Sequence, residues 1–112
     1  MSIRFAVTVL PQAEQDADSI FDWLQGKSRQ GALAWYEALG IALQELARQG
    51  DIHNYAPESE RVKRPVRQKL FKTLRGRTYR ILYEIEADQL YILHIRAPGQ
   101  KLLSRRNLRR HE

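Results

Sequence analysis

Apolar and polar residues alternate in two runs near the centre of the chain, at positions 79–86 and 90–96. Side chains alternate across a β-strand, so the pattern predicts two strands, and residues 87–89 between them predict a tight turn. The even-numbered face mixes apolar residues with cations, so we expect one part of it to be covered by other segments and the other part to be a functional surface. The odd-numbered face is predicted to be buried; its residues are Tyr79, Ile81, Tyr83, Ile85, Tyr91, Leu93 and Ile95.

The N-terminal half is predicted to cover this hairpin, because an isolated hairpin is only marginally stable in water. Residues 2–10 alternate like a strand, and Pro11 ends that strand because proline lacks a backbone donor. Apolar residues then recur every three or four positions in 12–25 and 30–49, which predicts two amphipathic helices joined by a short link. Gly50 suits the C-terminal cap of the second helix.

Three large aromatic residues lie on these predicted helices: Trp23, Trp35 and Tyr36. Their size and helical spacing predict core positions. The alternative is that Trp23 or Trp35 lies at the rim of a groove that receives a partner.

The rest of the chain predicts a small sheet and a tail. Residues 51–65 are polar, contain two prolines and show no period, so we expect a loop, followed by a short strand at 68–73. The element order is then β-α-α-β-β-β. It predicts an α+β fold, with a helical hairpin packed on a small, mainly antiparallel, twisted sheet. We expect one domain over residues 1–101, and a basic tail at 102–112 that is either frayed or ordered by a partner.

Charge is divided unevenly along the chain, whose net charge is +6. Residues 1–60 carry four Lys/Arg and nine Asp/Glu, a net −5, whereas residues 61–112 carry fifteen Lys/Arg and four Asp/Glu, a net +11. Such a concentration of positive charge serves nucleic acid, an acidic protein partner, or a solvated surface.

Most catalytic signatures are missing from the sequence. The chain has no cysteine, and its three histidines lack the spacing of metal ligands, so we expect no metal and no cofactor. It contains no glycine-rich phosphate loop, no HExxH and no G-x-S-x-G. Glu84 and Glu86 are expected to form ion pairs with nearby Arg or Lys. The lack of cysteine, of a signal peptide and of an apolar run of roughly 18 residues favours a cytoplasmic protein without a membrane span.

What remains is a cationic surface with tyrosines interleaved. Guanidinium and ammonium groups bind phosphate oxygens, and aromatic faces stack on unpaired bases. Metal-free cleavage of a phosphodiester needs cations to hold the developing charge, together with a proton donor and acceptor. The pattern is compatible with RNA cleavage without being specific to it. The candidate binding residues are Arg67, Lys69, Lys72, Arg75, Arg77, Arg80, His94, Arg96, Lys101, Arg105 and Arg106.

Three stretches carry a family resemblance. Residues 9–24 (VLPQAEQDADSIFDWL) combine a strand end with an acidic, alanine-bearing helix, and residues 31–50 (GALAWYEALGIALQELARQG) form a second helix. Residues 76–100 (GRTYRILYEIEADQLYILHIRAPGQ) show a glycine, an aromatic residue, an arginine, two apolar residues and a tyrosine, then a turn and a final apolar strand. In this order they resemble the RelE/ParE superfamily, the toxin halves of bacterial type II toxin–antitoxin pairs, over residues 3–101. The resemblance implies that family's fold.

The resemblance also implies one of two activities. RelE-like members cut messenger RNA in the ribosomal A site, with basic residues and often a C-terminal tyrosine, whereas ParE-like members act against DNA gyrase without ribonuclease activity. No tyrosine follows Tyr91 here, and the helical hairpin of residues 12–49 looks more ParE-like. The chain therefore looks more like a ParE-like toxin of a plasmid stabilisation-like module, and that resemblance implies a non-catalytic protein that inhibits gyrase.

Two alternatives stay open. A RelE-like chain would be a ribosome-dependent, metal-independent endoribonuclease. Arg80 matches the arginine of the family motif, and Lys69 and Lys72 lie near the basic pair that precedes it. Its catalytic candidates would be Lys69, Lys72, Arg80, Arg96 and Lys101. The other alternative is a non-toxic homologue that only binds a partner.

Either toxin interpretation implies a cognate antitoxin. We expect it to present an acidic, partly disordered segment to the basic sheet and the helical hairpin. The expected target is DNA gyrase, or the ribosome with its messenger RNA in the alternative; no membrane partner is expected.

Overall fold

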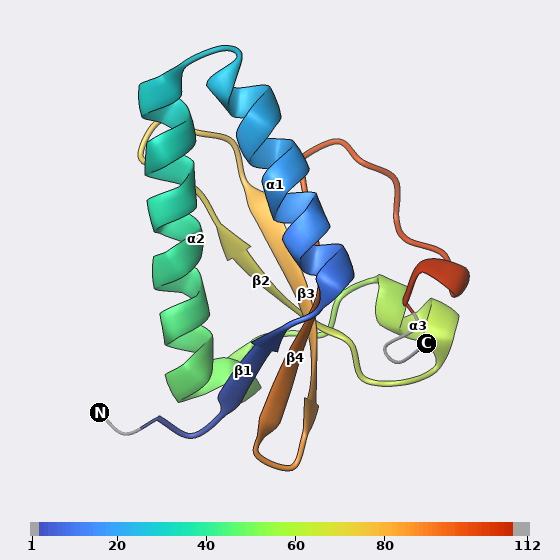
Figure 1. The fold of residues 1–112 in the computed structure, drawn as a ribbon. Helices are drawn as coiled ribbons and strands as arrows, with labels where there is room; N and C mark the ends of the chain where they lie inside the picture. The colour runs from blue at the N-terminus through green and yellow to red at the C-terminus, as the bar shows by residue number, and fades with distance from the viewer. Residues whose placement is uncertain (1–2, 109–112) are drawn as a thin grey trace.

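Two long helices lie against a four-stranded sheet in the computed structural model, which describes residues 3–108 (Figure 1). The predicted α+β fold and its main element order are confirmed. The elements are β1 (Ala6–Val9), α1 (Pro11–Gln25), α2 (Arg29–Gln49), the 3-10 turn η1 (Gly50–Ile52), α3 (Glu58–Val62), β2 (Arg67–Phe71), β3 (Tyr79–Glu86), β4 (Gln89–Arg96) and the 3-10 turn η2 (Arg106–Leu108).

Local sequence signals set the ends of the long helices. Pro11 occupies the first turn of α1, where its missing N–H costs no helical hydrogen bond. The hydroxyl of Ser28 caps α2 by accepting a hydrogen bond from the Gly31 N–H at 3.0 Å. The predicted helix starts at 12 and 30 are each one residue late.

The first strand joins the last in the sheet, whose order is β1-β4-β3-β2. β1 runs parallel to β4, while β3 is antiparallel to both β4 and β2. A parallel neighbour requires a crossover connection, which α1 and α2 provide on one face of the sheet (Figure 1). The expectation of a mainly antiparallel sheet is confirmed.

A β-bulge in β4 reverses the predicted alternation over half of that strand. The pairing register shifts between Leu82 and Tyr83, so that Leu93 is an extra residue in β4. Ile92 consequently belongs to the core under the helices, whereas Leu93 and Tyr91 pack on the opposite side of the sheet. The prediction that Tyr91 and Leu93 share the buried helix side is wrong, because one extra residue inverts a period of two.

The main core lies between the helices and the sheet, and Gly50 lets the end of α2 approach it closely. A Cβ at Gly50 would lie 2.4 Å from Cδ1 of the buried Leu90. The Tyr83 hydroxyl donates a hydrogen bond of 2.5 Å to the Gly50 carbonyl, and burial raises the pKa of that hydroxyl. Gly50 is the C-terminal cap of α2, as predicted. Its φ of −61° is open to any residue, so glycine is needed here because it has no side chain, not for its backbone freedom.

A second apolar cluster covers the opposite face of the sheet. Residues 51–65, predicted as a loop, contain the last two residues of η1 and all of α3, and both elements are too short to show a period. α3 and the segment that includes η2 lie beside each other on this face (Figure 1). The expectation that the tail 102–112 becomes ordered only with a partner stays a prediction, and residues 109–112 lie outside the described residues. The cluster consists of Ala56, Val66, Leu82, Leu93, Leu103 and Leu108.

Of the three aromatic residues predicted as core, only Trp35 is buried, at 2% exposure. Trp23 and Tyr36 are 60% and 59% exposed, so the prediction is wrong for both. The core-facing stripe of a helix covers little more than a quarter of its circumference, and these two side chains lie beyond it.

Candidate partner-binding site

The predicted cationic residues do not form one surface. Six of them are exposed: Lys72, Arg75 and Arg77 around the connection between β2 and β3, and Lys101, Arg105 and Arg106 after β4. The other five lie within the fold against partners of their own: Arg67, Lys69, Arg80, His94 and Arg96.

The two cations of β2 are both engaged. Arg67 donates a hydrogen bond to the His53 carbonyl at 2.7 Å, and its guanidinium lies over the Tyr55 ring at 4.7 Å. Lys69 faces α2, where its Nζ lies 3.3 Å from Glu45 Oε1, and its side chain is only 11% exposed. Neither side chain is presented freely to a large ligand.

Arg80 binds a fully buried carboxylate. Its Nη1 and Nη2 lie 2.9 and 2.8 Å from the two carboxylate oxygens of Glu58 in α3, and Nη1 also donates to Gln68 at 3.0 Å. Glu58 accepts a further hydrogen bond from the Leu103 N–H at 3.2 Å. Burial alone would raise the pKa of the Glu58 carboxyl, but the bonds from Arg80 and Leu103 hold it below its usual 4.5.

His94 is buried and bridges α1 to the C-terminal segment. Its Nδ1 lies 2.9 Å from Asp16 Oδ2, and its Nε2 lies 2.5 Å from the Asn107 carbonyl oxygen. The Ile95 N–H also donates to Asp16 Oδ2, at 3.0 Å. Burial would raise the pKa of the Asp16 carboxyl, but the hydrogen bonds from His94, Gln12 and Ile95 lower it overall. His94 is thus a connector between elements.

Arg96 lies opposite Arg80 in the sheet and is partly covered. Its Nη2 donates to the Lys101 carbonyl at 2.8 Å. Its Nε is buried without a hydrogen-bond partner within residues 3–108, and burial lowers the pKa of the guanidinium. Arg64 makes a similar link by pairing with Glu84 and donating to the Leu108 carbonyl. The expectation that Glu84 forms an ion pair is confirmed.

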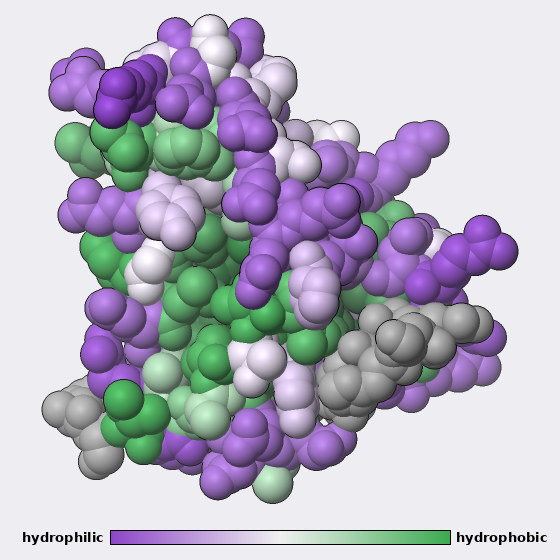
Figure 2. Space-filling model, in the orientation of Figure 1, coloured by the Kyte–Doolittle hydropathy of each residue, from purple (hydrophilic) through white to green (hydrophobic). Residues whose placement is uncertain are grey.

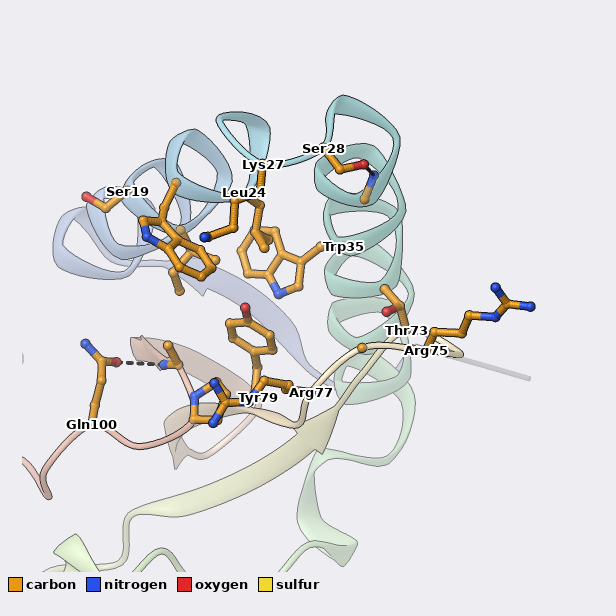
Figure 3. A pocket seen from close by; sticks show the side chains of 16 residues that line it. Ser19, Leu24, Lys27, Ser28, Trp35, Thr73, Arg75, Arg77, Tyr79 and Gln100 are labelled. Atoms are coloured by element: carbon orange, nitrogen blue, oxygen red, sulfur yellow. Dashed lines mark hydrogen bonds between the residues drawn. The ribbon is translucent and has the colours of Figure 1, made fainter.

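A pocket of about 670 Å³ lies beside the exposed cations of the β2–β3 connection (Figure 3). Its walls come from the C-terminal half of α1, the start of α2, residues 73–79, and residues 97–100 after β4. We call it the loop–helix pocket. Sequence reasoning missed it because its walls come from four separate segments.

Aromatic rings form the inner wall of the loop–helix pocket. The Trp35 and Tyr79 rings lie 5.5 Å apart, and Phe71 packs behind both at 6.0 and 5.8 Å. The Trp35 Nε1 is buried and has no hydrogen-bond partner within the described residues. An unpaired buried donor costs about 1–3 kcal/mol. The Tyr79 hydroxyl points into the pocket (Figure 3), and burial raises its pKa, partly opposed by Arg77.

The rim of this pocket is aromatic and cationic. Trp23 lies at the rim, as the sequence analysis allowed for a partner groove, with the Lys27 Nζ over its ring at 4.7 Å. Arg75 extends away from the pocket toward solvent in Figure 3, and Arg77 passes beside Tyr79. The residues that line the pocket include no Asp or Glu.

A second hollow, of about 350 Å³, lies between α1 and α2 above β1 and β4. Figure 2 shows apolar surface in this region, between the polar outer sides of the helices. Its lining includes Val9, Leu39 and Ile92, with Glu14 and Asp18 from α1. The two hollows are both apolar inside but have rims of opposite charge.

The family of the chain follows from a comparison with known proteins. The family model described as "ParE toxin of type II toxin-antitoxin system, parDE" matches residues 7–101. The match runs from the second residue of β1 through β4 and ends before the 3-10 turn η2. The chain belongs to the ParE toxin family of type II toxin–antitoxin systems, and an antitoxin partner is implied by that membership. No curated protein matches the chain at a significant level.

Residues 3–108 contain no helix that is long and apolar enough to cross a membrane. Across the same residues, no three His, Cys, Asp or Glu side chains gather in a way that would hold a metal ion.

Proposed function

We propose that this chain is a toxin that inhibits DNA gyrase in the cytoplasm and is neutralised by a cognate antitoxin, in a plasmid stabilisation-like module. The observation that carries the proposal is the match of the ParE toxin family model over residues 7–101. Residues 1–101 would form the toxin domain, and 102–112 the tail whose order depends on a partner.

The arrangement of the cations supports a non-catalytic toxin over a ribonuclease. A ribonuclease would need its cations to converge on one phosphate. Lys69 is bound to Glu45 on the helix side of the sheet, whereas Arg80 is bound to Glu58 on the opposite side. Lys72 and Lys101 are exposed on different segments.

The exposed cations are the contact residues we assign to a target or an antitoxin. Lys72, Arg75 and Arg77 stand on one connection and make no ion pair with residues 3–108. Exposed cations of this kind attract an acidic surface at long range, and salt screens that attraction.

Gyrase supercoiling assays with the purified chain test the proposal. We expect the chain to block supercoiling or to trap cleaved DNA, while primer extension on transcripts from arrested cells shows intact messages. Cuts at codon positions that require the ribosome would overturn the proposal and favour the RelE-like alternative. Normal growth with neither effect would favour the binding homologue.

A further inference from the structure

We propose that the loop–helix pocket receives a bulky apolar side chain from an acidic segment of the antitoxin. The inference rests on the proposed function, because it names the place where the antitoxin of that proposal inserts into this chain. Three features of the pocket carry it: an apolar interior with an unused donor, a cationic rim, and an inner Trp35 ring that other rings already cover.

The interior suits one or two inserted side chains. Its volume of about 670 Å³ falls within the range of about 300–1,000 Å³ typical of ligand pockets. An apolar side chain that enters it leaves water for walls made by Trp35, Tyr79 and Leu24. A backbone carbonyl of the inserted segment can accept the hydrogen bond that the Trp35 Nε1 does not make within residues 3–108, and the Tyr79 hydroxyl offers a second polar contact.

The rim selects an acidic segment. Lys27 and Arg77 stand at the rim, Arg75 extends from the rim toward solvent, and no carboxylate lines the pocket. The hollow between α1 and α2 carries Glu14 and Asp18 instead, and these would repel the same segment. Charge therefore directs an acidic partner to the loop–helix pocket and away from the other apolar hollow.

The aromatic faces disfavour a nucleic acid as the occupant. Single-stranded nucleic acid binds through open aromatic faces beside a groove of cations that follows its backbone. The Lys27 Nζ lies over one face of the Trp23 ring at 4.7 Å. The Trp35 ring packs against Tyr79 and Phe71 and is 2% exposed. The Trp35 indole therefore presents no stacking platform for a base, and Lys27 occupies one face of the exposed Trp23 ring.

The two tryptophans of the chain both line this pocket, which makes their indole N–H signals a specific reporter. The probe is a short synthetic peptide of Asp, Glu and Ser with one central Phe, added to the ¹⁵N-labelled full chain. Matched peptides carry Ala in place of Phe, or Lys in place of the acids, and a Trp23→Phe variant assigns the Trp35 signal. Peptides with central Leu, Met, Tyr or Trp complete the panel.

We expect the Trp35 indole N–H to shift downfield as it donates a hydrogen bond, and the Phe peptide to bind roughly tenfold more tightly than the Ala peptide. Arg77→Glu should weaken binding, whereas Arg48→Glu, the same charge change about 30 Å from Ser28 along α2, should not. The proposal is overturned if no central residue binds better than Ala, or if the two charge variants weaken binding equally. It is also overturned if a single-stranded oligonucleotide shifts the Trp35 signal with comparable affinity.

Failure of this inference is distinguishable from failure of the proposed function. Gyrase inhibition by the wild-type chain alone, without any peptide, tests the proposed function. A chain that inhibits gyrase but shows no shift of the Trp35 indole would overturn the pocket assignment and leave the toxin proposal in place. If a peptide shifts the signal as expected but the chain leaves gyrase unaffected, the pocket assignment stands and the toxin proposal is overturned.

Discussion

Arg80 and Glu58 form a bidentate ion pair between β3 and α3, in which the Arg80 Nη1 and Nη2 lie 2.9 and 2.8 Å from the two carboxylate oxygens. Glu58 is fully buried, and it also holds the Leu103 N–H of the C-terminal segment. One arginine of the sheet thereby fixes both elements that cover the second face. Arg80 is the arginine on which the resemblance of residues 76–100 partly rests, and in this fold it has a structural partner.

Replacing Arg80 with alanine is expected to destabilise the fold. The substitution leaves the Glu58 carboxylate buried without its cation, and breaking a buried pair in this way costs about 3–5 kcal/mol. Denaturant unfolding of the purified variant measures the loss directly. Growth arrest by Arg80→Ala should be compared with its melting temperature, because an unfolded toxin is also inactive.

Arg77→Ala is the matched control, since Arg77 is exposed two residues before β3 and makes no ion pair with residues 3–108. Its free energy of unfolding should stay within about 0.5 kcal/mol of the wild type. If Arg80→Ala were as stable as Arg77→Ala, the pair would be dispensable, and a direct role of Arg80 toward a target would gain support.

The Glu58 carboxyl should make the fold sensitive to acid. Its pKa is lower in the folded chain than its usual 4.5, so the unfolded chain binds the proton more readily. The stability that Glu58 contributes is fully present above a pH of about 4.5 and is lost as pH falls through the lower, folded pKa. Free energies of unfolding measured from neutral pH down to this region should show the loss.

Glu58→Gln removes this titration and gives the comparison. The variant should be less stable than the wild type near neutral pH, and the difference between them should shrink as pH falls. Glu60→Gln, an exposed neighbour in α3, is the control and should follow the wild type. A gap between wild type and Glu58→Gln that stayed constant with pH would contradict the assignment.

The ion pair of Arg80 and Glu58 shows which features of this fold the sequence predicts and which it does not. Alternation in residues 79–86 correctly places Arg80 and Ile81 on opposite faces of β3, because that pattern is local. Glu58 lies twenty-two residues earlier, in a segment without a period that was predicted as a loop. No local pattern can predict such a contact. From the sequence alone Arg80 is predicted to be a surface cation, whereas in the structure it is bound inside the fold.

The bulge and the loop–helix pocket were missed for related reasons. The extra residue Leu93 cannot be detected from the sequence, because it lies in a run of apolar residues that would fit on either face of the sheet. The pocket needs α1, α2 and the β2–β3 connection in place together before Trp23 and Arg77 line one hollow. By contrast, the two long helices carry a repeated period over many residues, and the sequence predicted their bounds to within one residue.

Replacing His94 with leucine is expected to loosen the C-terminal segment. His94 contacts Asp16 and the Asn107 carbonyl at once, and leucine would remove both contacts from a partly buried site. The loss should be roughly 1–3 kcal/mol, as is usual for a buried polar group that loses its partner. Hydrogen exchange should also accelerate at the amides of residues 103–108, which the bridge holds.

His53→Leu separates this effect from the general loss of an imidazole. His53 is half-buried, and its carbonyl, which accepts from Arg67, is retained in the variant. We expect its exchange rates at residues 103–108 to match the wild type. Equal acceleration in both variants would show that the His94 bridge does not hold the segment.

Gly40, inside α2, and Gly50, at its C-terminal cap, should respond in opposite directions to the same added methyl group. Gly50→Ala places a Cβ where Leu90 Cδ1 lies 2.4 Å away, in the main core, so Leu90 must shift and stability should fall by about 1–3 kcal/mol. Gly40, inside α2, has no atom within 4 Å of an added Cβ, and Gly40→Ala should stabilise the chain by about 0.5–1 kcal/mol through helix propensity. Thermal unfolding of both variants measures the pair. If Gly50→Ala were also stabilising, the close approach of Gly50 to Leu90 would be wrong, because the expected loss rests on that contact.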